Sequence, residues 1–258
     1  MPILSRITLY PIKSLDGVEV DQAEVLSGAG LKGDREWALF DGAGRLVNGK
    51  RTAAVHAVRS RFSPDLSEAV FQIGGRERTF RLPGDAGALG DWLSPHFGEA
   101  VRLERADGGF PDHADCPGPS LWGEGTLEEA GRWFPELAPD SLRRRFRTNL
   151  EISGAEPFWE DRLVPGAGEG VRFKIGAVTF ESLKACARCV VPTRDPETGA
   201  GLTGFAARLA ARREESLPAW APKARFDHYY RLAVLTAVVG GSPGARLRVG
   251  DSLEILDG

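Results

Sequence analysis

The sequence predicts a mainly β protein of the α+β class with few helices. Short runs rich in aliphatic, aromatic and β-branched residues recur along the whole chain. Turn residues separate these runs, and the 258 residues include 32 glycines and 17 prolines. Short strands joined by frequent turns are typical of a β-barrel or a β-sandwich. At roughly 150 residues per domain, the length allows one or two domains.

In the first half of the chain, the hydrophobic runs indicate strands at residues 3–10, 18–26, 37–40, 45–47, 70–73 and 78–82. The first of these strands ends at Pro11. The Asp41-Gly-Ala-Gly44 segment and the Gly74-Gly75 pair each join two of the strands, so each predicts a hairpin. A helix is expected over residues 88–97.

The second half predicts further strands at residues 146–152, 171–175, 178–183, 230–239, 247–249 and 253–256. A helix is expected to begin at Thr126 and to run to about Phe134, because Thr126 and Glu129 have the spacing of a capping box. Residues 204–214 place apolar side chains at helical spacing against an arginine face, which predicts another helix.

The least structured stretch is residues 107–125, which is rich in glycine and proline. We therefore expect a domain boundary within it and divide the chain into residues 1–115 and 116–258. Each part is long enough to bury a small hydrophobic core.

Composition and charge exclude several functional classes. The formal net charge is -3, which gives no indication of nucleic-acid binding. No apolar run reaches about 18 residues, so no membrane span is expected. Arg6, Lys13 and Asp16 interrupt any signal-peptide core, so we expect a cytoplasmic protein. The motifs of phosphate-loop NTPases, Rossmann dehydrogenases and HExxH metalloproteases are absent from the sequence.

The most informative segment is residues 184–199, in which Cys186 and Cys189 have a CxxC spacing. A thioredoxin-like dithiol normally opens a helix, whereas Val190-Val-Pro192 is a poor helix start. A structural zinc site needs four ligands, and only Cys116 and isolated histidines remain to complete one. In a third interpretation, both thiols are buried and inert.

The remaining interpretation is a single thiolate bound to a soft metal. Thiolates are strong ligands for electron-accepting metals. Arg188 stands beside Cys189 in the sequence, and a neighbouring guanidinium favours the ionised sulfur. The spacing alone does not name the metal.

A family resemblance rests on an ordered set of motifs that covers nearly the whole chain. The motifs are Tyr10-Pro-Ile-Lys-Ser14, Gly33-Asp-Arg-Glu-Trp37, Phe146-Arg-Thr-Asn149, Cys186-Ala-Arg-Cys189 with Thr193, Asp195-Pro196 and Thr198-Gly199, and Val249-Gly-Asp251. Each motif is weak alone, but their order and spacing together resemble the MOSC family, named for the C-terminal domain of molybdenum-cofactor sulfurases. The chain resembles in particular the mitochondrial amidoxime-reducing components and their bacterial counterparts. The resemblance implies a β-barrel MOSC domain packed with an N-terminal β-barrel-like module.

The resemblance also implies a cofactor and a set of site residues. Cys189, the second cysteine of the CxRC motif, is expected to bind molybdenum and to be the catalytic residue. The expected cofactor is the molybdenum cofactor, a pterin with a terminal phosphate, and not pyridoxal phosphate. The expected cofactor-binding residues are Lys13, Ser14, Arg35, Arg147, Arg188, Tyr229 and Cys116. A phosphate needs fixed cations, and the predicted strands would bring several of these residues together.

By resemblance, the chain is expected to be a molybdenum-dependent oxidoreductase that reduces N-hydroxylated small molecules such as amidoximes and hydroxylamines. With Cys189 committed, too few of the three cysteines remain for an iron–sulfur cluster. Electrons are therefore expected from a separate partner of the ferredoxin or flavoprotein type. The alternatives are a molybdenum-cofactor carrier, a sulfur-transfer protein in which Cys189 bears a persulfide, and a β-rich binding module without a cofactor.

Overall fold

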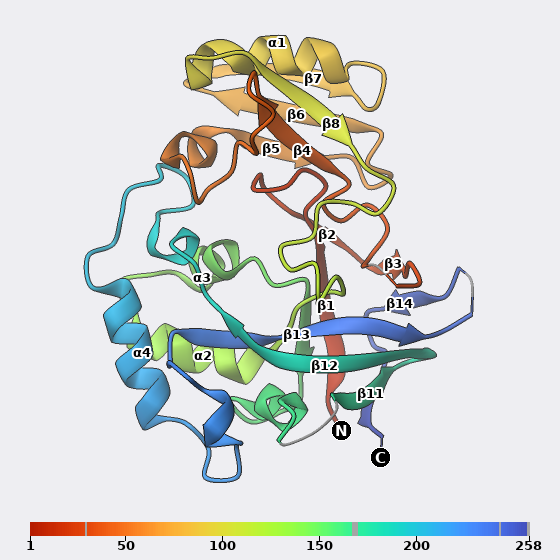
Figure 1. Cartoon of the computed structure of the whole chain (residues 1–258), viewed down its shortest axis with the longest axis vertical. Helices are drawn as coiled ribbons and strands as arrows, with labels where there is room; N and C mark the ends of the chain where they lie inside the picture. Colours follow the sequence, from red (N-terminus) through yellow and green to blue (C-terminus); the bar gives the residue numbers. More distant parts are fainter. Residues whose placement is uncertain (29, 167–169, 243, 257–258) are drawn as a thin grey trace.

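The computed structural model describes residues 1–28, 30–166, 170–242 and 244–256, and Figure 1 shows an upper and a lower lobe. The lower lobe is built on an eight-stranded sheet with the order β15-β11-β12-β13-β9-β10-β1-β2. Neighbouring strands are antiparallel except β9 and β10, which run parallel. The strands are β1 (Ile3–Leu9), β2 (Val18–Val20), β9 (Leu121–Gly123), β10 (Leu150–Ser153), β11 (Val171–Ile175), β12 (Val178–Ala187), β13 (Arg231–Gly240) and β15 (Leu253–Ile255).

The large sheet does not close into a barrel within the described residues. Its order ends at β15 and at β2, although an isolated bridge between Ile3 and Ser252 brings β1 beside the start of β15. There, the backbone N–H of Leu4 donates to the carbonyl of Asp251 at 2.8 Å. The mainly β class with few helices is confirmed, while the sheet itself stays open.

The upper lobe has a hydrophobic core of its own. Phe71, Phe80 and Leu89 are buried at its centre. Gly74 and Gly75 have φ angles of 54° and 80°, which a tight hairpin turn between β6 and β7 requires. The elements of this lobe are β4 (Trp37–Asp41), β5 (Arg59–Phe62), β6 (Glu68–Ile73), β7 (Arg76–Arg81), α1 (Ala86–Phe97) and β8 (Val101–Arg105), with a 3₁₀ turn at Ala53–Ala57.

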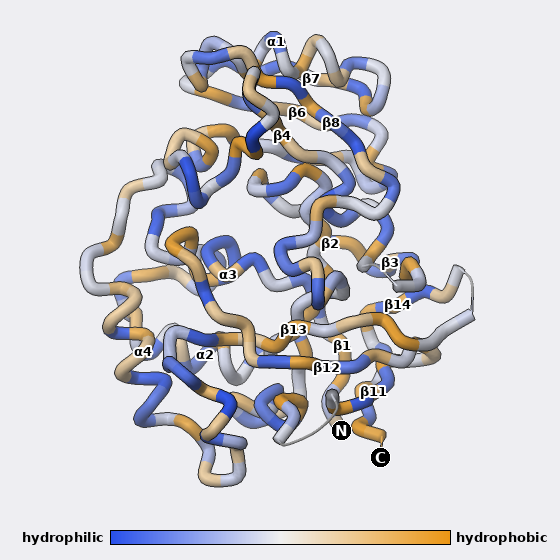
Figure 2. The backbone as a smooth tube through the Cα atoms, viewed as in Figure 1, coloured by the Kyte–Doolittle hydropathy of each residue, from blue (hydrophilic) through white to orange (hydrophobic). Residues whose placement is uncertain are grey.

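Three helices lie beside the large sheet, on the left of the lower lobe in Figure 1. The rings of Phe134 and Phe205 stack between them with centroids 4.4 Å apart. Figure 2 shows hydrophobic residues along β13, where Leu232 to Thr236 are buried. Among the described helices, none has the length and hydrophobicity needed to span a membrane. The helices are α2 (Glu124–Trp133), α3 (Pro139–Phe146) and α4 (Phe205–Glu215), and a small ribbon pairs β3 (Gln22–Glu24) with β14 (Arg246–Arg248).

Most predicted elements are present, and the differences have physical reasons. The predicted helices at 88–97 and 204–214 correspond to α1 and α4, and both predicted hairpins form. The predicted strand at 146–152 begins only at Leu150, because α3 occupies the preceding residues and Arg147 ends it with a φ of 54°. Within the stretch predicted to be loop, Leu121–Gly123 forms β9 by pairing in parallel with β10.

The predicted capping box at Thr126 is wrong. The helix α2 begins at Glu124, and Gly123 caps it without a side-chain hydrogen bond. The hydroxyl of Thr126 is engaged elsewhere: it donates to Glu160 Oε2 at 2.8 Å and accepts from the backbone N–H of Phe158 at 2.7 Å. The Thr126 hydroxyl therefore bonds to residues distant in sequence and does not cap α2.

The large sheet crosses the predicted domain boundary near residue 115. The N-terminal strands β1 and β2 belong to the sheet formed by the second half, because β1 pairs with β10. Leu4, Ile7 and Leu9 are buried in the same core as Phe173 and Phe180. The division into residues 1–115 and 116–258 stays a prediction, but the first strands do not pack with the upper lobe alone.

Candidate functional site

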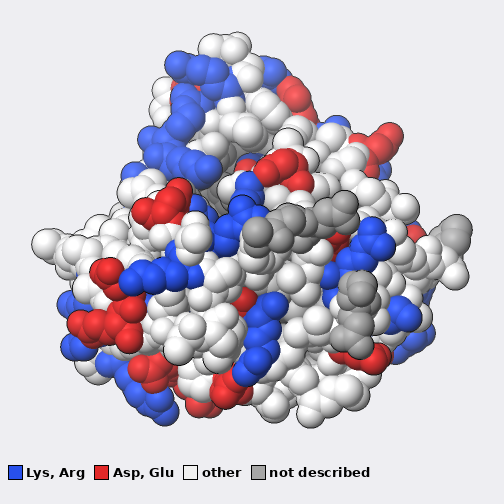
Figure 3. Space-filling view, turned by 60° about the horizontal axis from the view of Figure 1, so that its bottom comes forward, with Lys and Arg blue, Asp and Glu red and all other residues white. Residues whose placement is uncertain are grey.

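A cavity of about 400 Å³ is lined by residues of both lobes. All of the predicted site residues except Tyr229 line it, namely Lys13, Ser14, Arg35, Cys116, Arg147, Arg188 and Cys189. Figure 3 shows a hollow beneath the upper lobe, with Lys and Arg side chains along it and acidic side chains at its edge. The fold thus brings motifs from both ends of the chain to one space.

Lys13 and Arg35 hold an acidic side chain at one wall of the cavity. Lys13 Nζ donates to Asp112 Oδ1 at 2.6 Å and to the carbonyl of Phe110 at 2.8 Å. Arg35 Nε lies 3.3 Å from Asp112 Oδ2. Burial alone would raise the pKa of Asp112, but Arg35 and Lys13 hold that pKa well below its ordinary value. The Asp112 carboxylate is therefore an anion held by two of the cations that the family resemblance predicts to bind the cofactor.

The ring of Tyr10 contacts two guanidinium groups. The guanidinium carbon of Arg147 is 4.1 Å from the centroid of the Tyr10 ring, and that of Arg35 is 5.2 Å away. Burial raises the pKa of the Tyr10 hydroxyl to about 12, although both arginines oppose this rise. Because cation–π contacts restrict where a guanidinium lies, Tyr10 fixes both arginines at the cavity wall.

The backbone at three predicted site residues is in the left-handed region. Ser14, Arg35 and Arg147 have φ angles of 73°, 52° and 54°. Such angles are uncommon for residues other than glycine and tend to cluster at functional sites. Here the surrounding contacts enforce them, since the Arg147 N–H still donates to the carbonyl of Arg143 at 2.8 Å.

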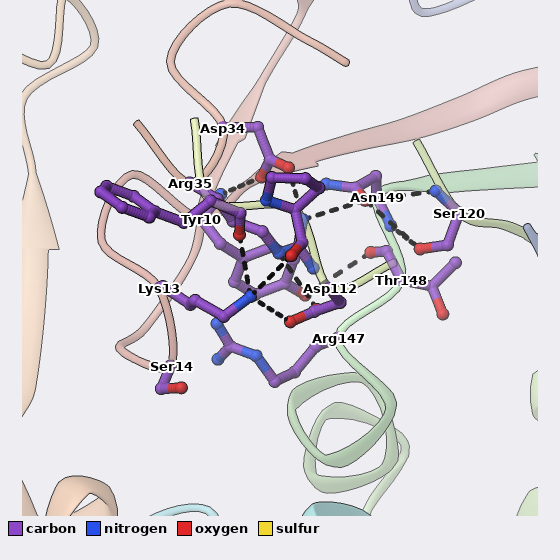
Figure 4. Close-up of polar contacts among 12 residues, drawn as sticks. Tyr10, Lys13, Ser14, Asp34, Arg35, Asp112, Ser120, Arg147, Thr148 and Asn149 are labelled. Atoms are coloured by element: carbon purple, nitrogen blue, oxygen red, sulfur yellow. Dashed lines mark hydrogen bonds and ion pairs between the residues drawn. The ribbon is translucent and has the colours of Figure 1, made fainter. Parts of the chain in front are cut away.

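Asp34 and Asn149 also line the cavity and form a hydrogen-bonded group with Arg35, which Figure 4 shows. Asn149 Nδ2 donates to Asp34 Oδ1 at 3.0 Å, and Arg35 Nη1 donates to Asn149 Oδ1 at 3.3 Å and to Asp34 Oδ2. The backbone N–H of Ser120 donates to Asn149 Oδ1 at 3.3 Å. Both residues stand within the motifs that contain Arg35 and Arg147, but the motifs alone assign them no role.

Two buried polar atoms on the cavity wall have no hydrogen-bond partner among the described residues. They are Nη2 of Arg147 and Nε2 of His56. Arg147 keeps a bond from Nη1 to the carbonyl of Leu15 at 2.7 Å. Burial first, and then the charges of Arg147 and Arg194, lower the pKa of His56 to about 4, so this imidazole is neutral near pH 7. Because buried polar groups are normally paired, both atoms mark positions for a ligand or for water.

Cys189 lines the cavity from the loop that follows β12. Its side chain is partly exposed, whereas Cys116 and Cys186 are buried. The Cys189 Sγ accepts from the backbone N–H of Val191 at 3.5 Å, and the Tyr230 hydroxyl donates to the Cys189 carbonyl at 3.1 Å. Burial raises the pKa of the Cys116 thiol to about 11. Cys189 is therefore the most accessible of the three thiols.

Arg188 contacts the first cysteine of the pair rather than the second. Its Nη1 lies 2.9 Å from the Sγ of Cys186 and 3.5 Å from the carbonyl of Leu232, while Nη2 donates to the carbonyl of Phe146. The expectation that this guanidinium favours an ionised Cys189 is thus not supported by the contacts. Arg188 instead joins β12 to the end of α3.

Arg145 is a buried residue of the site that sequence reasoning missed. Its Nη1 donates to the carbonyls of Pro192 at 3.1 Å and Arg194 at 2.6 Å, and Nη2 lies 3.5 Å from Asp195 Oδ2. These bonds fasten the turn at Val191–Thr193, which directly follows Cys189. Arg145 stands just before the Phe146-Arg-Thr-Asn149 motif and belongs to none of the motifs, so the sequence carries no signal that singles it out.

Tyr229 lies outside the cavity. Its ring stacks on Phe226 with centroids 6.3 Å apart and packs against the core of the large sheet. The neighbouring Tyr230 contacts the Cys189 loop instead. Neither tyrosine lines the cavity, and both precede β13, which begins at Arg231.

Two of the alternatives for the CxxC segment find no support in the geometry. Cys186 lies within β12 and Cys189 in the following loop, whereas a thioredoxin-like dithiol opens a helix. In the described part of the chain, no three His, Cys, Asp or Glu side chains gather as metal ligands. A closed zinc site with four protein ligands is therefore not formed by these residues.

Two family models match the chain and identify its family. Residues 1–83 match the MOSC N-terminal beta barrel domain, and residues 126–254, half of the chain, match the MOSC domain. The chain belongs to the MOSC family. Both halves are matched in the order that the motifs indicated.

Several known proteins are similar to this MOSC chain over 76% of its length. Mitochondrial amidoxime reducing component 2 of Bos taurus is 23% identical and is covered over 67% of its own length. Mitochondrial amidoxime-reducing component 1 of Danio rerio is 24% identical, with 70% covered. Molybdenum cofactor sulfurase of Oryza sativa subsp. japonica is 25% identical, but the chain spans only 29% of it. The last of these names connects the family with the molybdenum cofactor.

Among solved structures, the YUAD protein from Bacillus subtilis aligns with 99% of this chain and 96% of its own. The identity is 11% and the TM-score 0.38, so this likeness adds nothing to the assignment.

Proposed function

We propose that the cavity binds the molybdenum cofactor and that the chain reduces N-hydroxylated small molecules such as amidoximes and hydroxylamines. The observation that carries this proposal is the meeting of the Cys189 thiol with Lys13, Ser14, Arg35 and Arg147 on one cavity of about 400 Å³. The names of the amidoxime-reducing relatives, at 23% and 24% identity, favour a reductase.

The residues present fit a phosphate-bearing group next to a soft metal. Lys13 and Arg35 already bind the carboxylate of Asp112, and a phosphate would compete for the same cations. The unpartnered Nη2 of Arg147 provides a further donor at the wall. The Cys189 thiol is the soft donor expected of a molybdenum ligand. Tyr229 is not part of the proposed set.

When bound, the cofactor supplies the two-electron chemistry of molybdenum. The task of the chain is then to bind and orient. Arg145 and Tyr230 hold the loop that carries Cys189, while Tyr10 holds the guanidinium of Arg147. The Ser14 hydroxyl accepts from the backbone N–H of Gly49 at 3.4 Å, which leaves its own proton for an oxygen in the cavity.

The proposed reaction breaks an N–O bond, consumes two electrons and two protons, and releases water. The electrons would come from a separate ferredoxin- or flavoprotein-type protein, since three cysteines do not hold an iron–sulfur cluster once Cys189 is committed.

A second candidate function is a cofactor carrier or a sulfur-transfer protein. The similarity to a molybdenum cofactor sulfurase favours this candidate. The same cations and the same thiol would serve it, with Cys189 bearing either the metal or a persulfide.

The test is to purify the chain from a host that makes the cofactor, and to measure molybdenum content and benzamidoxime reduction with an artificial electron donor. Stoichiometric molybdenum with turnover supports the reductase. Molybdenum without turnover favours the carrier, and a persulfide on Cys189 without molybdenum favours sulfur transfer. A purified chain with neither molybdenum nor a persulfide would refute the reductase and the second candidate function alike.

A further inference from the structure

Two smaller spaces, both lined by Tyr10, lie beside the cavity. One has a volume of about 30 Å³ and the other, which opens to solvent beside β1 and α3, about 280 Å³. The smallest space shares Ser14, His56 and Arg147 with the cavity. It shares Tyr10, Asp16, Gly17 and Arg144 with the outer pocket. The three spaces therefore adjoin one another in a row.

Residues with unpartnered polar atoms line each of the three spaces. His56 and Arg147, whose Nε2 and Nη2 atoms have no partner among the described residues, line the cavity and the smallest space, and Arg144, whose Nε has none, lines the smallest space and the outer pocket. Ser60 and Thr148, whose hydroxyls also have no partner among the described residues, line the outer pocket. Among the described residues, the other buried side-chain atoms without a partner belong only to Arg194 and Arg213.

The chemistry of the row suits water. A space of about 30 Å³ has room for one or two water molecules, and polar cavities of this size are normally hydrated. The charged groups along the row are largely paired: Arg144 Nη1 lies 2.9 Å from Glu197, and Asp16 Oδ1 lies 3.1 Å from Arg59. These ion pairs offset part of the positive charge along the row.

Two side chains are placed to hand protons along such a row. Asp16 borders both the outer pocket and the smallest space, and its carboxylate has lone pairs that accept from water. His56 borders the smallest space and the cavity, and a neutral imidazole accepts a proton on one ring nitrogen while it releases one from the other.

We propose that these spaces form a water-filled passage that connects the cavity with the outer pocket and delivers protons by way of Asp16 and His56. This role rests on the proposed function, because reduction of an N–O bond takes up two protons and releases water. The existence of the water chain does not depend on that function.

The first experiment is a crystal structure of the full chain at a resolution that shows ordered water. We expect waters within hydrogen-bond distance of Arg144 Nε, Arg147 Nη2 and His56 Nε2, joined to waters in the outer pocket. A smallest space that is dry or filled by side chains would overturn the proposal, whether or not the chain is a reductase.

The second experiment compares steady-state kinetics of the loaded His56→Leu and Asp16→Asn variants. His228→Leu, an exposed change outside the passage, is the matched control. Blocked delivery predicts that kcat falls roughly tenfold or more while KM changes little, with a larger solvent isotope effect on kcat. Wild-type values of kcat and of the isotope effect in both passage variants would contradict proton delivery. Absence of turnover in every protein, wild type included, would count against the proposed reaction and leave the water structure as the deciding result.

Discussion

Among single residues, Cys189 is the one on which the proposed chemistry depends. It is the accessible thiol on the cavity, and the bonds of Tyr230 and Arg145 hold its loop. We predict that Cys189→Ala abolishes turnover. We also predict that it removes the metal–sulfur bond that a side chain contributes, and with it the corresponding metal–sulfur distance. X-ray absorption spectroscopy of the purified protein measures that distance.

The matched control for this prediction is Cys116→Ala, which also lines the cavity but is buried. It should keep both the metal–sulfur distance and measurable turnover. An unchanged spectrum in Cys189→Ala would show that Cys189 is not the metal ligand. Loss of that distance in Cys116→Ala alone would show that Cys116 is the ligand instead.

The unpartnered guanidinium nitrogen of Arg147 leads to a second prediction. Replacing Arg147 with Gln removes a charge-assisted contact of roughly 1.5–3 kcal/mol, so cofactor retention should fall by about tenfold to a hundredfold. The pterin released from the purified protein by denaturation measures that retention. Arg132→Gln, an exposed change on α2, is the control and should retain as much pterin as the wild type. Equal retention in both variants would exclude a phosphate role for Arg147.

For Asp112, in contrast to Arg147, we predict that a substitution strengthens the binding of an anion. Its carboxylate is held by Lys13 and Arg35, and it would compete with an anionic ligand for the same cations. Asp112→Asn should therefore bind inorganic pyrophosphate more tightly than the wild type, as measured by calorimetry on the chain without cofactor. Weaker or equal binding would show that Asp112 supports the anion site instead of competing for it.

Of the secondary-structure elements, the 3₁₀ turn Trp159–Leu163 carries a buried acid with a testable pH dependence. Burial, and next the charge of Asp161, raise the pKa of Glu160 from 4.5 to about 8. The folded chain therefore keeps a proton that the unfolded chain loses above pH 4.5. The contribution of Glu160 to stability is present below that pH and is lost as the pH rises to about 8.

Glu160→Gln replaces the titrating acid with a neutral amide that still accepts from the Thr126 hydroxyl. Relative to the wild type, the variant should gain unfolding free energy between pH 5 and pH 8 and show no further change above. Urea unfolding at several pH values measures the difference. Glu156→Gln, at an exposed position, should show no such trend. A difference that does not depend on pH would mean that Glu160 is ionised in the folded chain.

Elements set by local chemistry were predictable from the sequence, and those set by distant partners were not. The Gly74-Gly75 hairpin needs only its own turn residues, whereas the three-residue β9 exists because it pairs with β10 across 29 positions. Thr126 looked like a cap because its competing partner, Glu160, lies 34 residues away.

The same distinction holds for the candidate site. Its cations and Cys189 were found through ordered motifs, which carry information that a single residue lacks. Arg145 and His56 belong to no such motif, and their position on the cavity follows only from the packing of the turn after Cys189 and of the upper lobe. Tyr229 precedes β13 and packs against the core of the large sheet, a placement that follows from the fold of this segment and not from its sequence.

Considered as a whole, the molecule assembles its cavity across both halves of the chain. Lys13, Ser14 and Arg35 come from the first forty residues, while Arg147 and Cys189 come from the second half. The strand β1 links them, because it pairs with β10 and leads directly into the segment that carries Lys13. Cofactor binding should therefore depend on the integrity of the large sheet and not only on the residues that touch the ligand.

This dependence predicts how the chain behaves when it is divided at residue 115. Residues 116–258 alone lack β1 and β2, so β10 loses one of its two neighbouring strands and the core loses Leu4, Ile7 and Leu9. Burying such side chains contributes roughly 1.5–3 kcal/mol each, which is a large share of the stability of a typical domain. We expect this fragment to show no cooperative thermal transition. Joining residues 1–26 to it through a flexible linker should restore one, because the missing strands then return to their places in the sheet. Cooperative unfolding of residues 116–258 without the added segment would show that the second half folds as a domain of its own and that β1 merely docks onto it.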